Sequence, residues 1–125
     1  MNADDYLKNS KAYVWKESFA ITKASKPDPN AFINIVDKHE TTVIIDQSKL
    51  NKSLTIEKEL DFKLITLDII LPMNATGIIA KISGALAKDE ISIISIATYS
   101  RDHFLIKETD LAKAIISLKR LGITI

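Results

Sequence analysis

The chain has 125 residues, 46% of them hydrophobic, which suits one domain of ordinary size or two very small ones that share a core. Its 17 Lys and Arg balance 16 Asp and Glu for a net charge of +1, so no basic surface indicates a nucleic acid or an anionic membrane as partner. The absence of cysteine excludes disulfides and thiolate chemistry, and no apolar run approaches the roughly 20 residues of a membrane span.

The first half of the chain is expected to be rich in strands. Residues 1–10, MNADDYLKNS, lack the apolar region of a signal peptide, so we expect a loose terminus and a cytoplasmic protein. Aromatic and β-branched runs predict strands over 13–24, 32–37 and 41–46, the last two joined as a hairpin. From Leu54 the chain is expected to stay extended up to PMNATGII.

The second half carries clearer helix signals. Apolar residues predict a helix after this segment, with Asn74 or Thr76 as its cap; they are Ile78, Ile79, Ile82 and Leu86. Strands are predicted over 91–98 and 103–108. A second helix begins at Thr109 and Asp110 and places Leu111, Ile115 and Leu118 on one face, and Gly122 ends it before a short closing strand, ITI.

The predicted order β-α-β-β-α-β is that of a ferredoxin-like sandwich, in the α+β class, with two helices on one face of an antiparallel sheet. The strand 91–98 is apolar on both faces, with Ile91 and Ile93 alternating with Ile94 and Ile96. Two helices cover only one face, so the other is covered either by the N-terminal half of the chain or by a second subunit. The residues leave both possibilities open.

The sequence offers little that could support catalysis. His39 and His103 lie far apart without ligand spacing around either, so we expect no metal site and no cofactor. No nucleophile has a base at a spacing typical of an active site, which argues against an enzyme. Acylphosphatases share the layout but need an arginine in the loop at 73–76, and RNA-recognition motifs need exposed aromatic residues on the central strands; both features are missing.

The segment from Leu71 to Gly122 resembles an ACT domain, in particular the tandem-ACT group of small bacterial two-ACT proteins, CASTOR arginine sensors and aspartokinase-type domains. Members of that group have a proline, an apolar residue, Asp or Asn, and Thr-Gly before an aliphatic pair, as in PMNATGII. A further match is the segment ISIISIATYSRDHFLIKETDL. The N-terminal half is similar more weakly, through INIVDKHETTVIID.

This resemblance implies an ACT domain over 61–125, preceded by a degenerate, β-rich ACT-like half over 11–60. It further implies a homodimer and a non-catalytic regulatory module that binds a small molecule, usually an amino acid. The ligand would lie at the loop before the first helix, where a glycine lets the backbone approach and free N–H groups attract a carboxylate. The implied ligand-binding residues are Met73, Asn74, Thr76, Gly77, Ile78 and Asp102.

Three positions depart from the family pattern. Asn74 stands where an Asp is usual, Arg101 replaces a threonine, and His103 replaces an aromatic residue. The lost acid at Asn74 favours an alternative, a structural or interaction ACT module that dimerises or docks without a ligand. The stretch NATG is also typical of a plain helix cap and turn, so both functions stay open.

Overall fold

The computed structural model describes residues 1–125 and divides them into two units, Met1–Trp15 with Leu64–Ile125, and Lys16–Lys63. We call the first the helical unit and the second the strand unit. Strand β5 (Thr55–Leu67) continues from the strand unit into the helical unit. Its residues up to Lys63 belong to the strand unit, and those from Leu64 belong to the helical unit. These units do not follow the expected boundaries at residues 10 and 60, because residues 1–15 fold with the C-terminal half.

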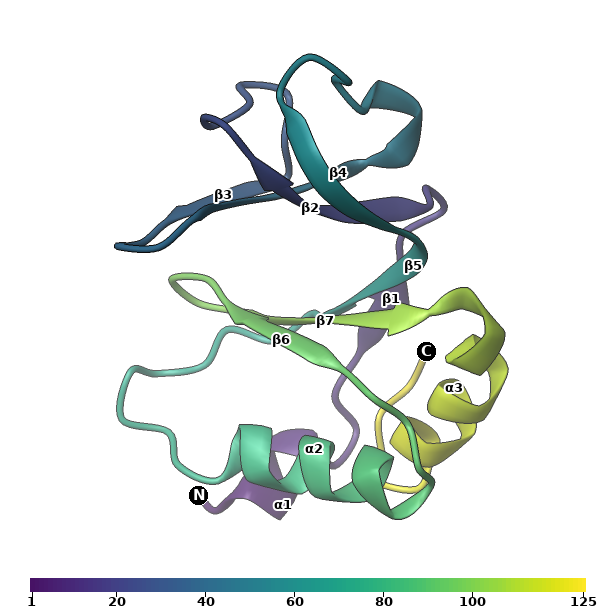
Figure 1. The fold of residues 1–125 in the computed structure, drawn as a ribbon. Coiled ribbons are helices and arrows are strands. Elements are labelled where there is room, and N and C mark those ends of the chain that lie inside the picture. Colours follow the sequence, from purple (N-terminus) through teal and green to yellow (C-terminus); the bar gives the residue numbers. More distant parts are fainter. The chain divides into compact units, whose positions relative to one another are not determined.

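The sheet of the helical unit has the order β1–β5–β7–β6, in which β1 spans Ala12–Val14, β7 Asp102–Lys107 and β6 Ile94–Ala97. Strand β1 is antiparallel to the end of β5, and β6 is antiparallel to β7 with Ala97 opposite Asp102. Helices α2 (Ile78–Lys88) and α3 (Leu111–Lys119) lie on one face of this sheet (Figure 1). A 3₁₀ turn, Glu108–Asp110, leads into α3. An α+β fold with an antiparallel sheet is thus confirmed.

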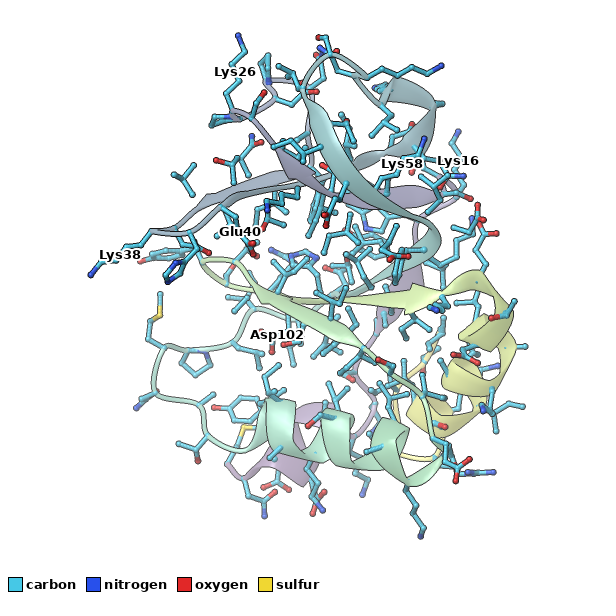
Figure 2. All side chains as sticks on the ribbon, viewed as in Figure 1. Lys16, Lys26, Lys38, Glu40, Lys58 and Asp102 are labelled. Carbon is cyan, nitrogen blue, oxygen red and sulfur yellow. The ribbon has the colours of Figure 1, made fainter.

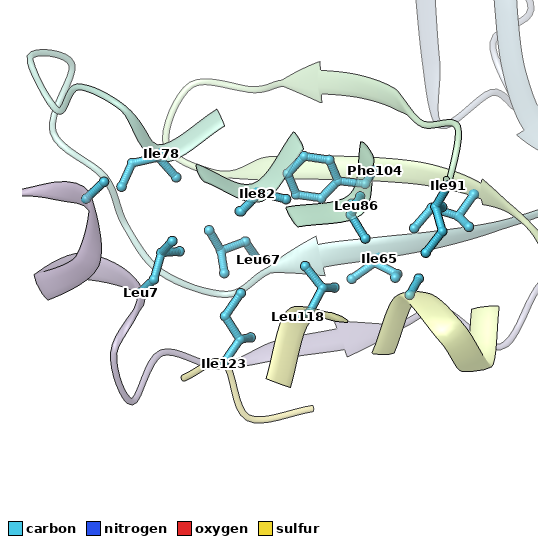
Figure 3. Packing of buried hydrophobic residues seen from close by; sticks show 13 residues of the cluster. Leu7, Ile65, Leu67, Ile78, Ile82, Leu86, Ile91, Phe104, Leu118 and Ile123 are labelled. Atoms are coloured by element: carbon cyan, nitrogen blue, oxygen red, sulfur yellow. The ribbon is translucent and has the colours of Figure 1, made fainter. Parts of the chain in front are cut away.

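A single buried cluster joins the helices to the sheet (Figure 3). Ile82 and Leu86 of α2 are fully buried, and burying one such side chain contributes about 1.5–3 kcal/mol. The apolar stripe predicted for α2 is correct except at Ile79, which is 37% exposed. Other members of the cluster that Figure 3 labels are Leu7, Ile65, Leu67, Ile78, Ile91, Phe104, Leu118 and Ile123.

The N-terminus is ordered, contrary to the expectation of a loose terminus. Residues Ala3–Leu7 form α1, which begins with a capping box: the Asn2 side chain accepts from the Asp5 N–H, and the Asp5 carboxylate accepts from the Asn2 N–H. Leu7 is buried in the main cluster, with 1% of its surface exposed. The short helix is held by this burial, because five residues cannot sustain a helix on their own.

Three predicted strands differ from the observed ones. The strand predicted over 91–98 is limited to β6, Ile94–Ala97. The run 13–24 is broken at Trp15–Ser18, so that β1 pairs with residues 65–67 of β5 while β2 (Phe19–Ala24) pairs with residues 55–62. The closing segment ITI forms no strand, because β1 already occupies that edge of β5; Thr124 makes only an isolated bridge with Lys11. The fourth strand of the sheet therefore comes from the N-terminus.

The strand unit has the sheet order β3–β4–β2–β5 and contains no α-helix, as expected for this half of the chain. Strands β3 (Ile33–Val36) and β4 (Thr41–Asp46) form the predicted hairpin, with Ile33 opposite Ile44. A 3₁₀ turn, Gln47–Lys49, follows β4. A small apolar cluster packs one face of this sheet; its buried members are Ala20, Ala24, Val43 and Ile45.

Candidate functional site

The loop between β5 and α2 forms the first wall of the candidate site. The Ala75 N–H donates to the Pro72 carbonyl at 3.0 Å and closes a turn, after which Gly77 occupies the N-cap position of α2. Gly77 has φ +82°, a left-handed conformation that glycine adopts without strain. The prediction that Asn74 or Thr76 caps this helix is wrong, because no side chain caps it.

The start of α2 therefore presents backbone donors. The first helical hydrogen bond runs from the Lys81 N–H to the Gly77 carbonyl at 3.0 Å, so the N–H groups of Ile78, Ile79 and Ala80 have no partner within the helix. The helix dipole adds a partial positive charge at this end. Together these features favour an anionic group such as a carboxylate.

The second wall is the turn Thr98–Arg101 between β6 and β7. The Thr98 N–H donates to the Arg101 carbonyl at 2.9 Å, and the Leu71 N–H donates to the Ser100 carbonyl at 3.0 Å. The second bond ties this turn to the loop before α2. Both walls belong to the helical unit.

Between the two walls lies a cavity of about 300 Å³. Most of its lining is apolar, and the rest comes from the turn Thr98–Arg101 and from Asp102. The lining residues are Leu71, Pro72, Met73, Ala75, Gly77, Ile78, Ile79, Ala80, Ala97, Thr98, Tyr99, Ser100, Arg101 and Asp102.

The structure brings four of the six predicted site residues to this cavity. Met73, Gly77, Ile78 and Asp102 line it, whereas Asn74 and Thr76 belong to the same loop but do not. Met73 lies at the rim, with 76% of its surface exposed. Sequence reasoning missed the contribution of Tyr99 and its neighbours; the polar turn YSRD, which ends with Asp102 itself, was the available signal.

Asp102 is the acidic residue of the cavity. Its place in β7 puts it on the same face as Phe104, which packs in the cluster under the helices, and Figure 2 shows its side chain on that side of the sheet. Only 9% of its surface is exposed, and neither a hydrogen bond nor an ion pair engages its carboxylate. Burial raises the pKa of Asp102 above its ordinary value. A cationic group in the cavity would pair with the Asp102 carboxylate and offset the free-energy cost of burying its charge.

Neither a metal site nor a membrane helix is evident in the structure. No group of three or more His, Asp or Glu side chains is placed to hold a metal ion. None of the helices is long and apolar enough to cross a bilayer. The cavity combines the backbone N–H groups at the start of α2 with the buried carboxylate of Asp102.

Comparison with known proteins identifies the domain that holds this cavity. Residues 59–120 match the family model of the ACT domain. The chain carries an ACT domain. That domain includes both walls of the cavity and Asp102. A comparison with curated proteins finds no match.

Solved structures resemble almost the whole chain. A protein of unknown function from Vibrio cholerae, described as a possible transport protein, is 21% identical with a TM-score of 0.80, covering 95% of this chain and 94% of that one. A protein from Agrobacterium tumefaciens is 18% identical with a TM-score of 0.79, over 93% and 91% of the two chains. The regulatory subunit of aspartate kinase from Thermus thermophilus, in ligand-free form, is 12% identical with a TM-score of 0.67, over 91% and 99%. At these identities the likeness shows a shared fold.

Proposed function

We propose that the chain is a non-catalytic regulatory module of the tandem-ACT type, acting in the cytoplasm, that binds an amino acid in the cavity beside α2. The observation that carries this proposal is the carboxylate of Asp102, which is nine-tenths buried, has no partner and lines a cavity whose opposite wall presents helix N–H groups. An amino acid supplies an ammonium group for the Asp102 carboxylate and a carboxylate for the helix N–H groups.

In this proposal the ligand carboxylate meets the N–H groups of Gly77 and Ile78 at the start of α2, and its ammonium group meets Asp102. Met73 and Ile78 contact the side chain of the ligand, and Asn74 contributes its amide from the loop. The mostly apolar lining favours ligands with an apolar side chain, because the other charged residue of the lining, Arg101, is already paired with Asp68.

A thermal-shift panel of the standard amino acids, followed by calorimetry on any that stabilise the chain, tests this function. We expect at least one aliphatic or aromatic amino acid to raise the melting temperature and to bind with one ligand per chain. The proposal fails if none of the panel shifts the melting temperature and calorimetry shows no heat of binding.

A second candidate is an ACT module that docks or dimerises without a ligand. Two large side chains that line the cavity are exposed, Met73 at 76% and Tyr99 at 87%. Such side chains are typical of contact surfaces when they gather in one place. If the panel is negative and Tyr99→Ser changes the assembly state, the second function replaces the first.

We also propose that the chain forms a homodimer. Strand β6 lies at the end of the strand order, so the outer backbone groups of Ile94–Ala97 have no neighbouring strand. Sedimentation at micromolar concentration should give about twice the chain mass of 13.9 kDa. A mass of one chain over that concentration range contradicts the dimer.

A further inference from the structure

A chain of hydrogen bonds crosses the sheet of the helical unit on the face away from the helices. Trp15 Nε1–H donates to Thr66 Oγ1 at 2.8 Å, and Thr66 Oγ1 lies 2.8 Å from His103 Nδ1. On the other side of the ring, His103 Nε2 lies 3.0 Å from Thr98 Oγ1, which donates to the Arg101 carbonyl at 3.0 Å. His103 points this way because its neighbours in β7, Asp102 and Phe104, face the helices.

The direction of the outer bonds determines the form of the imidazole. Thr66 accepts a proton from the indole, so its own hydroxyl proton is available for Nδ1. Thr98 gives its proton to a carbonyl, so it accepts from Nε2–H. The neutral Nε2–H tautomer pairs every donor with an acceptor along this chain of bonds, whereas an imidazolium would leave the hydroxyl proton of Thr66 without His103 Nδ1 as its acceptor.

This chain of bonds ends on a wall of the cavity. Thr98 begins the turn Thr98–Arg101, whose own hydrogen bonds hold the loop before α2. The turn Thr98–Arg101 joins the end of β6 to Asp102, the first residue of β7. The buried ring of His103 thus lies behind the cavity without lining it.

We propose that His103, as the neutral Nε2–H tautomer, is a positioning residue that holds Thr98 and thereby shapes the turn that receives the ligand. The role at the ligand rests on the proposed function, whereas the hold on the turn is independent of any ligand. The two ring nitrogens of His103 then have different roles. The hydrogen bond at Nε2 orients the turn, and the hydrogen bond at Nδ1 anchors the ring to Thr66 and, through it, to Trp15.

Two variants of similar polarity separate these sides. In His103→Gln the side-chain amide reaches the position of Nε2 and still donates to Thr98, whereas in His103→Asn it reaches only the position of Nδ1. We measure hydrogen exchange at the amides of Thr98 and Leu71, with urea unfolding to correct for any shared loss of global stability. Loss of one hydrogen bond predicts about tenfold faster exchange in the Asn variant and less than about threefold in the Gln variant. Equal acceleration in both variants, or none in either, overturns the proposal.

Nitrogen NMR of the unsubstituted chain keeps the test open should a variant fail to fold. At neutral pH we expect a protonated Nε2 and an unprotonated Nδ1 for His103; the opposite tautomer overturns the proposal.

Calorimetry then tests the role of His103 at the ligand, using the amino acid that binds the parent chain. We expect roughly tenfold weaker binding for His103→Asn and less than roughly threefold for His103→Gln. Equal affinities of the two variants contradict a positioning role. If no amino acid binds the parent chain, the proposed function fails, and the exchange and tautomer measurements still decide whether His103 holds the turn.

Discussion

Arg101 pairs with Asp68 and not with its neighbour Asp102. The Arg101 Nε lies 3.1 Å from Asp68 Oδ1, while the Asp102 carboxylate has no ion pair. The guanidinium of its neighbour in sequence is thus engaged elsewhere, and the cost of burying the Asp102 carboxylate is not offset by an ion pair with Arg101. Because the Asp102 carboxylate has no ion pair in the free chain, a cationic ligand group that pairs with it contributes more binding free energy.

Asp102→Asn should therefore stabilise the ligand-free chain, by about 0.5–2 kcal/mol, because a neutral amide is cheaper to bury. Because burial raises the pKa of folded Asp102 above its ordinary value of 3.8, the stability present below that value is lost as the pH rises through the folded pKa. Asp102→Asn should accordingly have the larger free energy of unfolding at pH values above the folded pKa of Asp102, and the two proteins should become equally stable in acid. Urea unfolding across that pH range is the measurement, and a variant less stable than the parent at neutral pH contradicts the argument.

The same substitution should weaken ligand binding. A charge-assisted contact contributes on the order of 1.5–3 kcal/mol, so Asp102→Asn should lose roughly tenfold to a hundredfold in affinity. Calorimetry with the amino acid found in the panel measures this. Unchanged affinity would mean that the ligand lies elsewhere.

Stability should also depend on the protonation of His103. Burial, and secondarily the Arg101 cation, lower the pKa of His103 below its ordinary value of 6.5. The unfolded chain then binds a proton more readily, so this contribution to stability is complete above 6.5 and is lost as pH falls through the folded pKa. Between about pH 7.5 and pH 5 the parent should lose more free energy of unfolding than His103→Gln does. Parallel losses in the two proteins would show that His103 titrates alike in both states.

The elements that were predictable from sequence are those marked by a local pattern of residue types. Helix α2 was predictable, apart from its cap, because its buried positions Ile78, Ile82 and Leu86 recur at helical spacing, and β-branched runs mark the hairpin of β3 and β4. Helix α1 and the supply of a strand by the N-terminus were missed, because both depend on tertiary burial and strand pairing that no local pattern encodes.

The candidate site was predictable only in part. Family similarity led to Met73, Gly77, Ile78 and Asp102, which the structure brings to one cavity. The positive φ of Gly77 and the hydrogen bonds of Thr98 and His103 are set by the path of the chain through two loops, which residue types alone do not specify.

Two glycines of the ACT domain should respond oppositely to alanine. Gly77 has φ +82°, and although an added Cβ would make only an ordinary contact 3.5 Å from Ala3 Cβ, the left-handed backbone should cost about 1–2 kcal/mol. Gly84 lies within α2 with nothing near an added Cβ, so Gly84→Ala should stabilise by about 0.5–1 kcal/mol. Thermal or urea unfolding of the two alanine variants is the measurement. If both variants are less stable than the parent, the loss comes from changing α2 and not from the conformation of Gly77.

Glu90 ends α2 in a conformation that favours glycine. Its φ is +59°, its N–H donates to the Ala87 carbonyl, and the Ile91 N–H donates to the Leu86 carbonyl, which together form a Schellman motif. Glu90→Gly should stabilise the chain by about 1 kcal/mol, because it relieves left-handed strain. Glu90→Ala is the matched control and should change little in urea unfolding; an equal gain from alanine would point to the loss of charge instead.

Leu7 tests whether the N-terminus is part of the core. Leu7→Ala should cost about 2–5 kcal/mol, as expected for a fully buried leucine. The exposed Met1 is the control, since Met1 has 84% of its surface exposed and deleting its side chain should leave unfolding unchanged. A loss below about 1 kcal/mol for Leu7→Ala would favour the loose terminus expected from sequence.

The most direct measurement of the central claim is a crystal structure grown with the amino acid that the thermal-shift panel selects. We expect ligand density in the cavity beside α2, with the ligand carboxylate at the N–H groups of Gly77 and Ile78 and its ammonium group within hydrogen-bond distance of Asp102. Density for the ligand at any other place, with this cavity empty while calorimetry shows binding, would contradict it.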